Sequence, residues 1–176
     1  SLAAFHNGIA IDSTAELSAN SGLMMGTRSG SIDPGVIFHL YRQGMSMEDI
    51  ETLLMKKSGL LGVSDISSDM RTLLASDDPK AQLAVDMYVY SVAQNIAKLA
   101  VSLGGLDAIV WTGGIGENSA GIRELVLDRL GDAGFQCDLS NALNETVKEG
   151  LISYSPADGI ASLVIPTNEE LMIAKY

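Results

Sequence analysis

The sequence predicts an α/β fold, because short apolar runs typical of strands alternate along the chain with helical segments. Residues 108–111 are a continuous apolar run, which is typical of a strand buried on both faces. Residues 79–103 form the longest helical segment, apolar almost all round, and we expect it to be the buried central helix. We see no internal repeat or linker, so we expect one domain over residues 1–176.

The first third of the chain predicts a hairpin, a long loop and a helix. Residues 1–5 and 8–11 are typical of two short strands joined at His6-Asn7, since Asn-Gly is a strong hairpin-turn dipeptide. Residues 14–31 are rich in Ser, Gly and Asn and predict a loop, and loops of this length are usually functional. Asp33-Pro34 then opens a helix that runs to about residue 43.

The remaining elements alternate between helices and strands. Ser46 is expected to cap a helix that continues to residue 59, and Ser67 or Ser68 a short helix through residue 74. The long helix starts at Asp77-Asp78-Pro79. After the central strand the chain predicts a glycine-rich loop, a helix over 119–130, strands at 151–154 and 162–165, and a last helix from Glu169.

Composition excludes several classes of partner. Eleven Lys and Arg stand against 22 Asp and Glu, giving a formal net charge of −11, which repels phosphate backbones and anionic lipid. We therefore expect no nucleic-acid and no membrane partner. One cysteine, Cys137, can form neither an internal disulfide nor a cysteine metal cluster, and is typical of a small core residue in a reducing cytosol. We accordingly expect a cytoplasmic location.

The sharpest motif is Thr112–Asn118 (TGGIGEN), between a predicted strand and a predicted helix. Glycines there would let backbone N–H groups approach a ligand closely, and a helix N-terminus would favour an anion or a polar sugar. The motif is not a P-loop, because no Gly-Lys-Ser/Thr follows, and Ser119 stands where a Rossmann fingerprint needs its third glycine. The alternative interpretation is a tight turn with no ligand.

A second candidate is Arg28, between the glycines of Gly22–Gly30 (GLMMGTRSG). An Arg in this setting suits a carboxylate or phosphate clamp, and the alternative is a solvated surface Arg. The flanking Leu-Met-Met is expected to anchor the loop in the core, which favours a fixed guanidinium.

Two weaker candidates complete the set. Ser67–Arg71 (SSDMR) lies at a helix start, and on spacing alone a plain cap with a surface Arg is the better interpretation. In Pro166–Glu170 (PTNEE) the carboxylates would either complement a helix dipole or bind Mg²⁺, directly or through water.

Together these four segments, with Ile32–Pro34, resemble the acetate kinase (short-chain carboxylate kinase) family in sequence and order, over essentially the whole chain. The resemblance implies transfer of the γ-phosphoryl group of ATP to acetate, giving acetyl phosphate and ADP, with Mg²⁺ or Mn²⁺. It also implies a homodimer and the actin-like, sugar-kinase-like ATPase fold, which has a ribonuclease H-like core in each of two related α/β domains.

The resemblance assigns a role to each motif. Arg28 falls on the family's transition-state arginine, and Glu169 on its Mg²⁺ ligand. The remaining positions fall on nucleotide-binding residues, namely Asp69, Met70, Arg71, Gly114, Ile115, Gly116, Glu117 and Asn118. One departure is the segment Leu17–Gly22, where the family usually has Phe-Thr-(Ala or Pro)-Leu-Glu-Gly.

In the family, an amino-terminal domain supplies a catalytic Asp and the His and Arg of the acyl-phosphate site, and this chain contains none of them. We therefore expect the chain to be the carboxy-terminal, nucleotide-binding domain, inactive on its own. The alternatives are a propionate or butyrate kinase, or a non-catalytic nucleotide-binding or dimerisation fragment.

Overall fold

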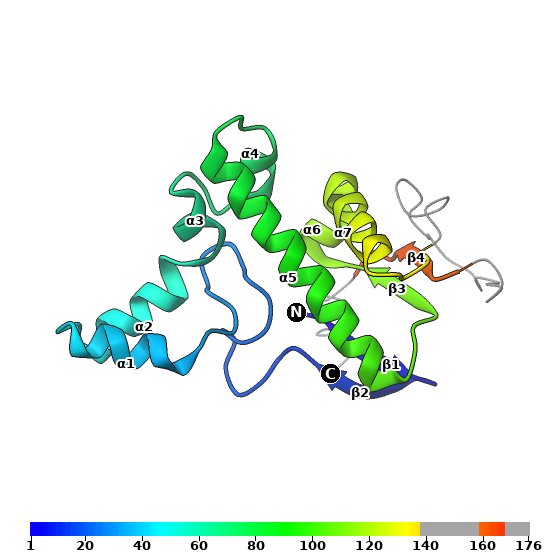
Figure 1. Ribbon diagram of the computed structural model, residues 1–176, viewed down its shortest axis with the longest axis horizontal. Helices are drawn as coiled ribbons and strands as arrows, with labels where there is room; N and C mark the ends of the chain where they lie inside the picture. The colour runs from blue at the N-terminus through cyan, green and yellow to red at the C-terminus, as the bar shows by residue number, and fades with distance from the viewer. Residues whose placement is uncertain (138–158, 168–176) are drawn as a thin grey trace. The chain divides into compact units, whose positions relative to one another are not determined.

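The computed structural model describes residues 1–137 and 159–167, which form a mixed α/β structure (Figure 1). The chain divides into two compact units, Ser1–Gly104 and Gly105–Tyr176. The expected single domain over residues 1–176 stays a prediction. The expected strand at 151–154 and the helix expected from Glu169 lie outside the described residues.

The first unit begins with the expected hairpin. Strands β1 (Ala3–His6) and β2 (Ile9–Ser13) pair antiparallel. Both turn residues have positive φ, 50° at Asn7 and 77° at Gly8. A type I′ turn requires this conformation and matches the twist of the strands, so the Asn-Gly prediction is confirmed.

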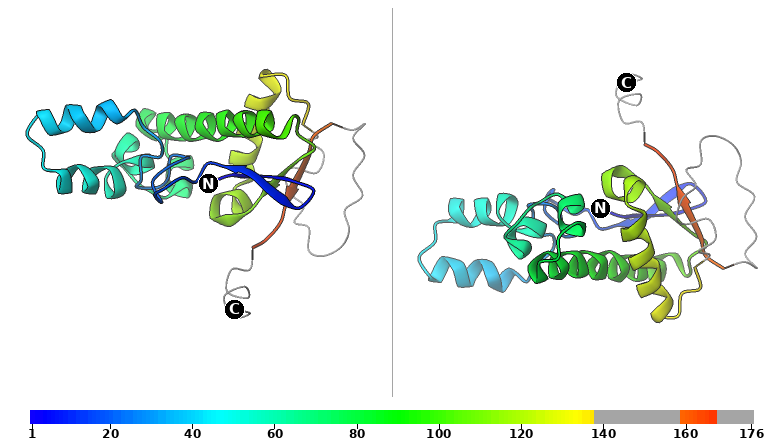
Figure 2. Two further views of the ribbon diagram at one scale, coloured as in Figure 1. Left: turned by 90° about the horizontal axis from the view of Figure 1, so that it is seen from below. Right: turned by 90° about the horizontal axis from the view of Figure 1, so that it is seen from above.

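Two capped helices follow the loop over residues 14–31. In α1 (Pro34–Arg42) the Asp33 side chain accepts a hydrogen bond from the Gly35 N–H. In α2 (Met47–Lys56) the Ser46 hydroxyl accepts one from the Asp49 N–H. These caps satisfy orphan donors of the first turn, as the sequence predicted. The two helices lie side by side and are joined by a short turn (Figure 2).

The next helices differ from expectation. Instead of continuing to residue 59, α2 ends at Lys56, and a separate helix α3 (Gly59–Ser64) begins at Gly59. The reason is that the N–H groups of Ser58, Leu60 and Leu61 donate to carbonyls of residues 25–27. Asp69, not Ser67 or Ser68, caps α4 (Met70–Leu74), because its carboxylate accepts from the Arg71 N–H.

The long helix α5 (Pro79–Leu103) starts at the Asp78 cap and ends at Gly104, as expected. It packs against α3, α4, β1 and β2 (Figure 1). The expectation that it is buried all round is wrong, since Leu83, Met87, Tyr90 and Val101 are exposed. No helix within the described residues is long and apolar enough to cross a membrane.

The second unit is built on two parallel strands, β3 (Ala108–Trp111) and β4 (Ala161–Val164). Both predicted strands are confirmed. The Trp111 Nε1 joins them by donating to the Ser162 hydroxyl at 2.7 Å. Burial on both faces of β3 was also expected and is wrong, because Val110 is 50% exposed while its neighbours Ile109 and Trp111 are buried.

Two helices lie between these strands along the chain. The predicted helix is α7 (Ala120–Asp132), whose buried residues include Ile122, Val126 and Leu130. The expected glycine loop is itself a short helix, α6 (Gly113–Asn118). It forms because side chains within it close the turn: the Glu117 carboxylate accepts from the Gly113 N–H and the Asn118 amide donates to the Gly114 carbonyl.

Candidate functional site

The loop that carries Arg28 is fixed by main-chain hydrogen bonds. The carbonyls of Met25, Gly26 and Thr27 accept from the N–H groups of Leu60, Leu61 and Ser58, at 2.8 to 2.9 Å. Within the loop the Met25 N–H donates to the Arg28 carbonyl at 3.1 Å. Leu23 and Met24 are buried, as predicted, while Met25 is half-buried. The position of Arg28 therefore depends on backbone contacts and a short apolar anchor.

Two glycines make this docking possible. Gly59 has a φ of +62°, and a Cβ there would collide with the Met25 carbonyl oxygen and lie 2.7 Å from that of Arg28. Gly30 has a φ of +73°, and a Cβ would lie 2.7 Å from the carbonyl oxygens of Gly22 and Leu23. Side chains rarely adopt such angles, and these sites also lack the space for one. Glycine at position 59 lets the loop lie directly on the start of α3, and glycine at position 30 lets the two ends of the loop approach each other.

The Arg28 side chain is half-buried, and its Nη1 donates to the Ala19 carbonyl at 3.1 Å. Ala19 belongs to the segment in which the sequence departs from the family pattern. Within the described residues no carboxylate forms an ion pair with Arg28. The rest of the guanidinium fork is available for an anionic ligand, the task to which Arg is better suited than Lys.

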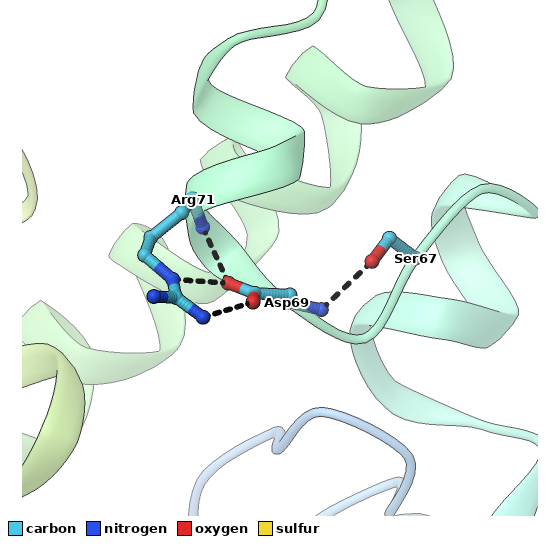
Figure 3. Close-up of polar contacts among 3 residues, drawn as sticks. All are labelled: Ser67, Asp69 and Arg71. Carbon is cyan, nitrogen blue, oxygen red and sulfur yellow. Dashed lines mark hydrogen bonds and ion pairs between the residues drawn. The ribbon is translucent and has the colours of Figure 1, made fainter.

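Asp69 and Arg71 form a preassembled pair at the start of α4 (Figure 3). Arg71 donates through Nε and Nη2 to the two carboxylate oxygens, at 3.1 and 2.6 Å, and the Asp69 N–H donates to the Ser67 hydroxyl. The hydrogen bonds from the Arg71 side chain, and then the one from the Arg71 backbone N–H, lower the pKa of Asp69. The Arg71 side chain is 88% exposed, so its fork faces solvent.

The first unit brings these motifs together. A Cβ on Gly26 would lie 3.0 Å from the Ser68 carbonyl oxygen, so the Arg28 loop touches the segment before the Asp69 cap. Met70, expected beside them, is buried, and its side chain is part of the unit's core. A role for Met70 in nucleotide binding stays a prediction.

In the second unit a single oxygen organises the glycine turn. Glu117 Oε1 accepts from the Gly113 N–H at 2.8 Å and from the Thr112 hydroxyl at 3.2 Å. It also accepts from both the N–H and the hydroxyl of Thr167, at 3.0 Å each. These hydrogen bonds, with those from Thr167 and Gly113 backbone foremost, lower the pKa of Glu117.

Arg123 holds the other end of the turn and was missed by the sequence analysis. Its Nη1 donates to the carbonyls of Gly116 and Glu117, at 2.8 and 3.1 Å, and the residue is only 4% exposed. Burial lowers the pKa of this guanidinium. The sequence signal that could have found it is an Arg in the first turn of a helix, next to the apolar Ile122 and one turn before the apolar Val126.

The glycines themselves leave open space. Gly113 and Gly114 are exposed, and a Cβ placed on either one would have no described residue within 4 Å apart from its chain neighbours and its own helix backbone. The φ of Gly114 is one that any residue can adopt, so neither its backbone nor the described packing around it requires a glycine. Open space at a glycine is what close approach of a ligand to the backbone would use.

No metal centre is assembled among the described residues. There, no group of three or more His, Cys, Asp or Glu side chains is arranged to hold a metal ion. Glu169, the expected Mg²⁺ ligand, lies outside the described residues. The described chain reaches Thr167, two residues earlier, where Glu117 binds it.

Comparison with known proteins identifies the family. The model of the acetokinase family matches residues 1–175. An acetate kinase of Rickettsia akari (strain Hartford) is 44% identical over 177 residues, covering 99% of this chain and 45% of that protein.

Two crystal structures are also similar. The acetate kinase of Porphyromonas gingivalis has a TM-score of 0.83, and a propionate kinase from Francisella tularensis subsp. tularensis SCHU S4 has one of 0.81. Each is 37% identical and covers 98% of this chain and 44% of its own. This chain thus spans less than half the length of these proteins, and it belongs to the acetokinase family.

Proposed function

We propose that the chain is the carboxy-terminal, nucleotide-binding domain of an acetate kinase. Such an enzyme transfers the γ-phosphoryl group of ATP to acetate, reversibly, and gives acetyl phosphate and ADP. The observation that carries the proposal is the family match over residues 1–175. Its support from structure is the TM-score of 0.83 to an acetate kinase. We propose the actin-like ATPase fold, with a ribonuclease H-like core, for the same reason.

Arg28 is the proposed catalytic residue. Phosphoryl transfer is mostly positioning and neutralisation of charge, which needs a cation held at the transferring group. The main-chain bonds of residues 25–28 supply a fixed support, and the guanidinium has no carboxylate partner among the described residues. A planar fork holds two phosphoryl oxygens in a fixed bidentate geometry, which the rotatable donors of an ammonium group do not provide.

The nucleotide is assigned to two sets of residues. Asp69, Met70 and Arg71 are proposed to contact it, and the donors of the exposed Arg71 guanidinium that Asp69 does not use would bind an anion. The turn Gly114–Asn118 is proposed as its adenosine-side partner, supported by the open space at Gly114. Its role there is to present backbone groups at close range.

A divalent cation, Mg²⁺ or Mn²⁺, is proposed as the cofactor. Such ions prefer carboxylate oxygens and phosphate oxygens of a bound nucleotide. Glu169 is the proposed ligand, carried over from the family, and bound metal would neutralise charge on the phosphates. We further propose a homodimer in the cytoplasm, carried over from the family. We also propose no nucleic-acid or membrane partner, because the net charge of −11 repels phosphate backbones and anionic lipid.

Acetate is the proposed acceptor. The Rickettsia akari relative, at 44% identity, is named as an acetate kinase. The propionate kinase structure is 37% identical, no more than the acetate kinase structure, so it gives no reason to prefer propionate. The test is the ratio of kcat/KM for acetate, propionate and butyrate in the reconstituted enzyme described next.

The decisive experiment assays acetyl phosphate, trapped as the hydroxamate, with rigorously purified chain. The chain alone is expected to bind ADP weakly and to show no turnover, because positioning by half of a site is insufficient. Adding the amino-terminal half of an acetate kinase relative as a separate chain should produce activity. Robust turnover by these 176 residues alone would contradict the proposal that catalysis needs the amino-terminal half. Nucleotide binding without turnover in either preparation would favour a non-catalytic binding fragment.

A further inference from the structure

Glu117 joins the ends of two neighbouring strands. Thr112 and Gly113 directly follow β3, and Thr167 lies three residues after β4, its parallel partner. All three donate to the same carboxylate oxygen, Oε1, at 2.8 to 3.2 Å. In parallel α/β sheets, ligands bind outside the carboxyl ends of the strands. Glu117 thus fixes two backbone segments relative to each other where a ligand would approach.

The hydrogen bonds also define what the Glu117 side chain can do. A carboxylate oxygen has two lone pairs, and this one already accepts four hydrogen bonds. Bonds to an ionised acceptor are about twice as strong as neutral ones. The acceptor capacity of this oxygen is therefore used by protein donors. Because these donors favour the ionised carboxylate, the pKa of Glu117 is lowered.

Arg123 supports the other end of the turn. Its guanidinium binds the carbonyls of Gly116 and Glu117, so the turn is held at its start by one side chain and at its end by another. Between these supports Gly114 faces open space. The turn is therefore shaped by side chains, while the surface it offers to a ligand is main chain.

We propose that Glu117 and Thr167 are positioning residues: together they set the geometry of the glycine turn for nucleotide, and the Glu117 carboxylate itself does not touch the nucleotide. This inference rests on the proposed nucleotide-binding function. It reassigns Glu117 from a contact residue to a support and adds Thr167, which no motif singled out for this role.

The first arm of the test compares single substitutions in the 176-residue chain. Thr167→Val removes the hydroxyl bond and keeps the shape and the N–H, whereas Thr167→Ser keeps the hydroxyl. Glu117→Gln removes the charge, and Glu124→Gln on the exposed side of α7 is the matched control. ADP binding is followed by the fluorescence of Trp111, the only Trp, up to millimolar ADP.

We expect Thr167→Val and Glu117→Gln to raise the dissociation constant for ADP about 10-fold, the scale of one hydrogen bond to a charged group. Thr167→Ser and Glu124→Gln should bind as wild type. Amide hydrogen exchange should speed up at both Gly113 and Thr167 in Glu117→Gln, although the two residues are far apart in sequence. If Glu117→Gln does not fold, the Thr167 pair decides the question alone.

The second arm separates positioning from direct contact. ADP, 2′-deoxy-ADP and 3′-deoxy-ADP are titrated against wild type and Glu117→Gln. A positioning residue weakens all three equally, so the ratios of their dissociation constants stay unchanged. A carboxylate that binds a ribose hydroxyl would make the ratio for that hydroxyl fall toward one in Glu117→Gln, which would overturn the inference.

The outcomes also separate this inference from the function beneath it. Binding of ADP that Thr167→Val leaves unchanged would overturn the positioning role alone. Absence of ADP binding in both wild type and Glu124→Gln would instead overturn the proposed function.

Discussion

The two candidate loops of this chain are held in opposite ways. The Arg28 loop in the first unit is fixed by its backbone, through carbonyls of residues 25–27 that accept from the start of α3. The glycine turn in the second unit is fixed by side chains, chiefly Glu117, Thr167 and Arg123. Both loops are rich in glycine, yet their glycines serve different ends.

At the Arg28 loop, glycines make room for the protein itself. A side chain at Gly30 in the loop, or at Gly59 at the start of α3, would meet carbonyl oxygens at distances too short to tolerate. In the turn, Gly113 and Gly114 face open space, which is room for something else. Replacing a glycine at the Arg28 loop should therefore reduce stability, whereas replacing one in the turn should reduce ligand binding.

The largest expected effect is on turnover, from Arg28→Lys. In the reconstituted enzyme the rate of acetyl phosphate formation should fall about 1,000-fold or more, the range of an arginine that stabilises a transferring phosphoryl group. Stability should change by less than about 1 kcal/mol, because backbone bonds hold the loop. Hydroxamate assays and urea unfolding measure the two effects.

ADP binding in the Arg28→Lys variant is the control, and it should change little. Near-normal turnover in this variant would show that Arg28 does not act at the transferring group. A large loss of stability would contradict the distinction between the two loops, since it would mean that the Arg28 side chain supports its loop.

Gly59→Ala should produce the largest loss of stability. A left-handed angle costs a residue with a Cβ about 1–2 kcal/mol. The collision with the Met25 carbonyl adds about 1–3 kcal/mol of overpacking. Gly44→Ala is the matched control, because Gly44 has a φ of +93° but nothing within 4 Å of a Cβ. If Gly59→Ala and Gly44→Ala lose the same free energy of unfolding in urea, the loop is not tightly docked on α3.

These contrasts show where sequence reasoning succeeded. The Asn-Gly turn and the caps at Asp33, Ser46 and Asp78 were predictable, because each depends on a few consecutive residues. Strand β3 was also found, from its apolar run. The family followed from motifs in order along the chain, and the match over residues 1–175 confirms it.

What sequence reasoning missed depends on contacts between distant residues. The break between α2 and α3 arises from the loop at residues 25–27, about thirty positions earlier, and no local pattern predicts it. The bond from Thr167 to Glu117 spans 50 positions. Burial of α5 was overestimated, because apolar composition shows that a face can be buried and not whether a neighbour covers it.

Gly114→Val tests the other loop and should separate binding from stability. Among the described residues, nothing outside its own helix backbone and chain neighbours lies within 4 Å of a Cβ at Gly114. The free energy of unfolding should therefore stay within about 1 kcal/mol of wild type. The fluorescence response of Trp111 to ADP should disappear, since the side chain would occupy the space that the nucleotide needs. A full, titratable ADP response would place the nucleotide elsewhere. A large loss of stability would mean that this glycine also serves the protein.

The smallest expected effect is a difference in pH dependence between the loops. Hydrogen bonds from the Thr167 and Gly113 backbone lower the pKa of Glu117. A carboxylate with a lowered pKa in the folded state stabilises the protein at pH above its pKa in the unfolded state. That contribution is lost as the pH falls through its pKa in the folded state. The bonds to Glu117 should thus persist at pH values where an ordinary glutamate, with a pKa of about 4.3, is already protonated.

Amide chemical shifts followed from pH 6 downward measure this difference, since they report each hydrogen bond separately. The Gly113 and Thr167 signals should move together, below the ordinary glutamate range, because both N–H groups donate to the same oxygen. The Leu60 and Leu61 signals should stay in place, because their acceptors are backbone carbonyls that do not titrate. Movement of Gly113 without Thr167 would show that Glu117 binds only its own turn. Movement of Leu60 in the same range would show that the Arg28 loop also depends on an ionised side chain, which would remove the distinction between the two loops.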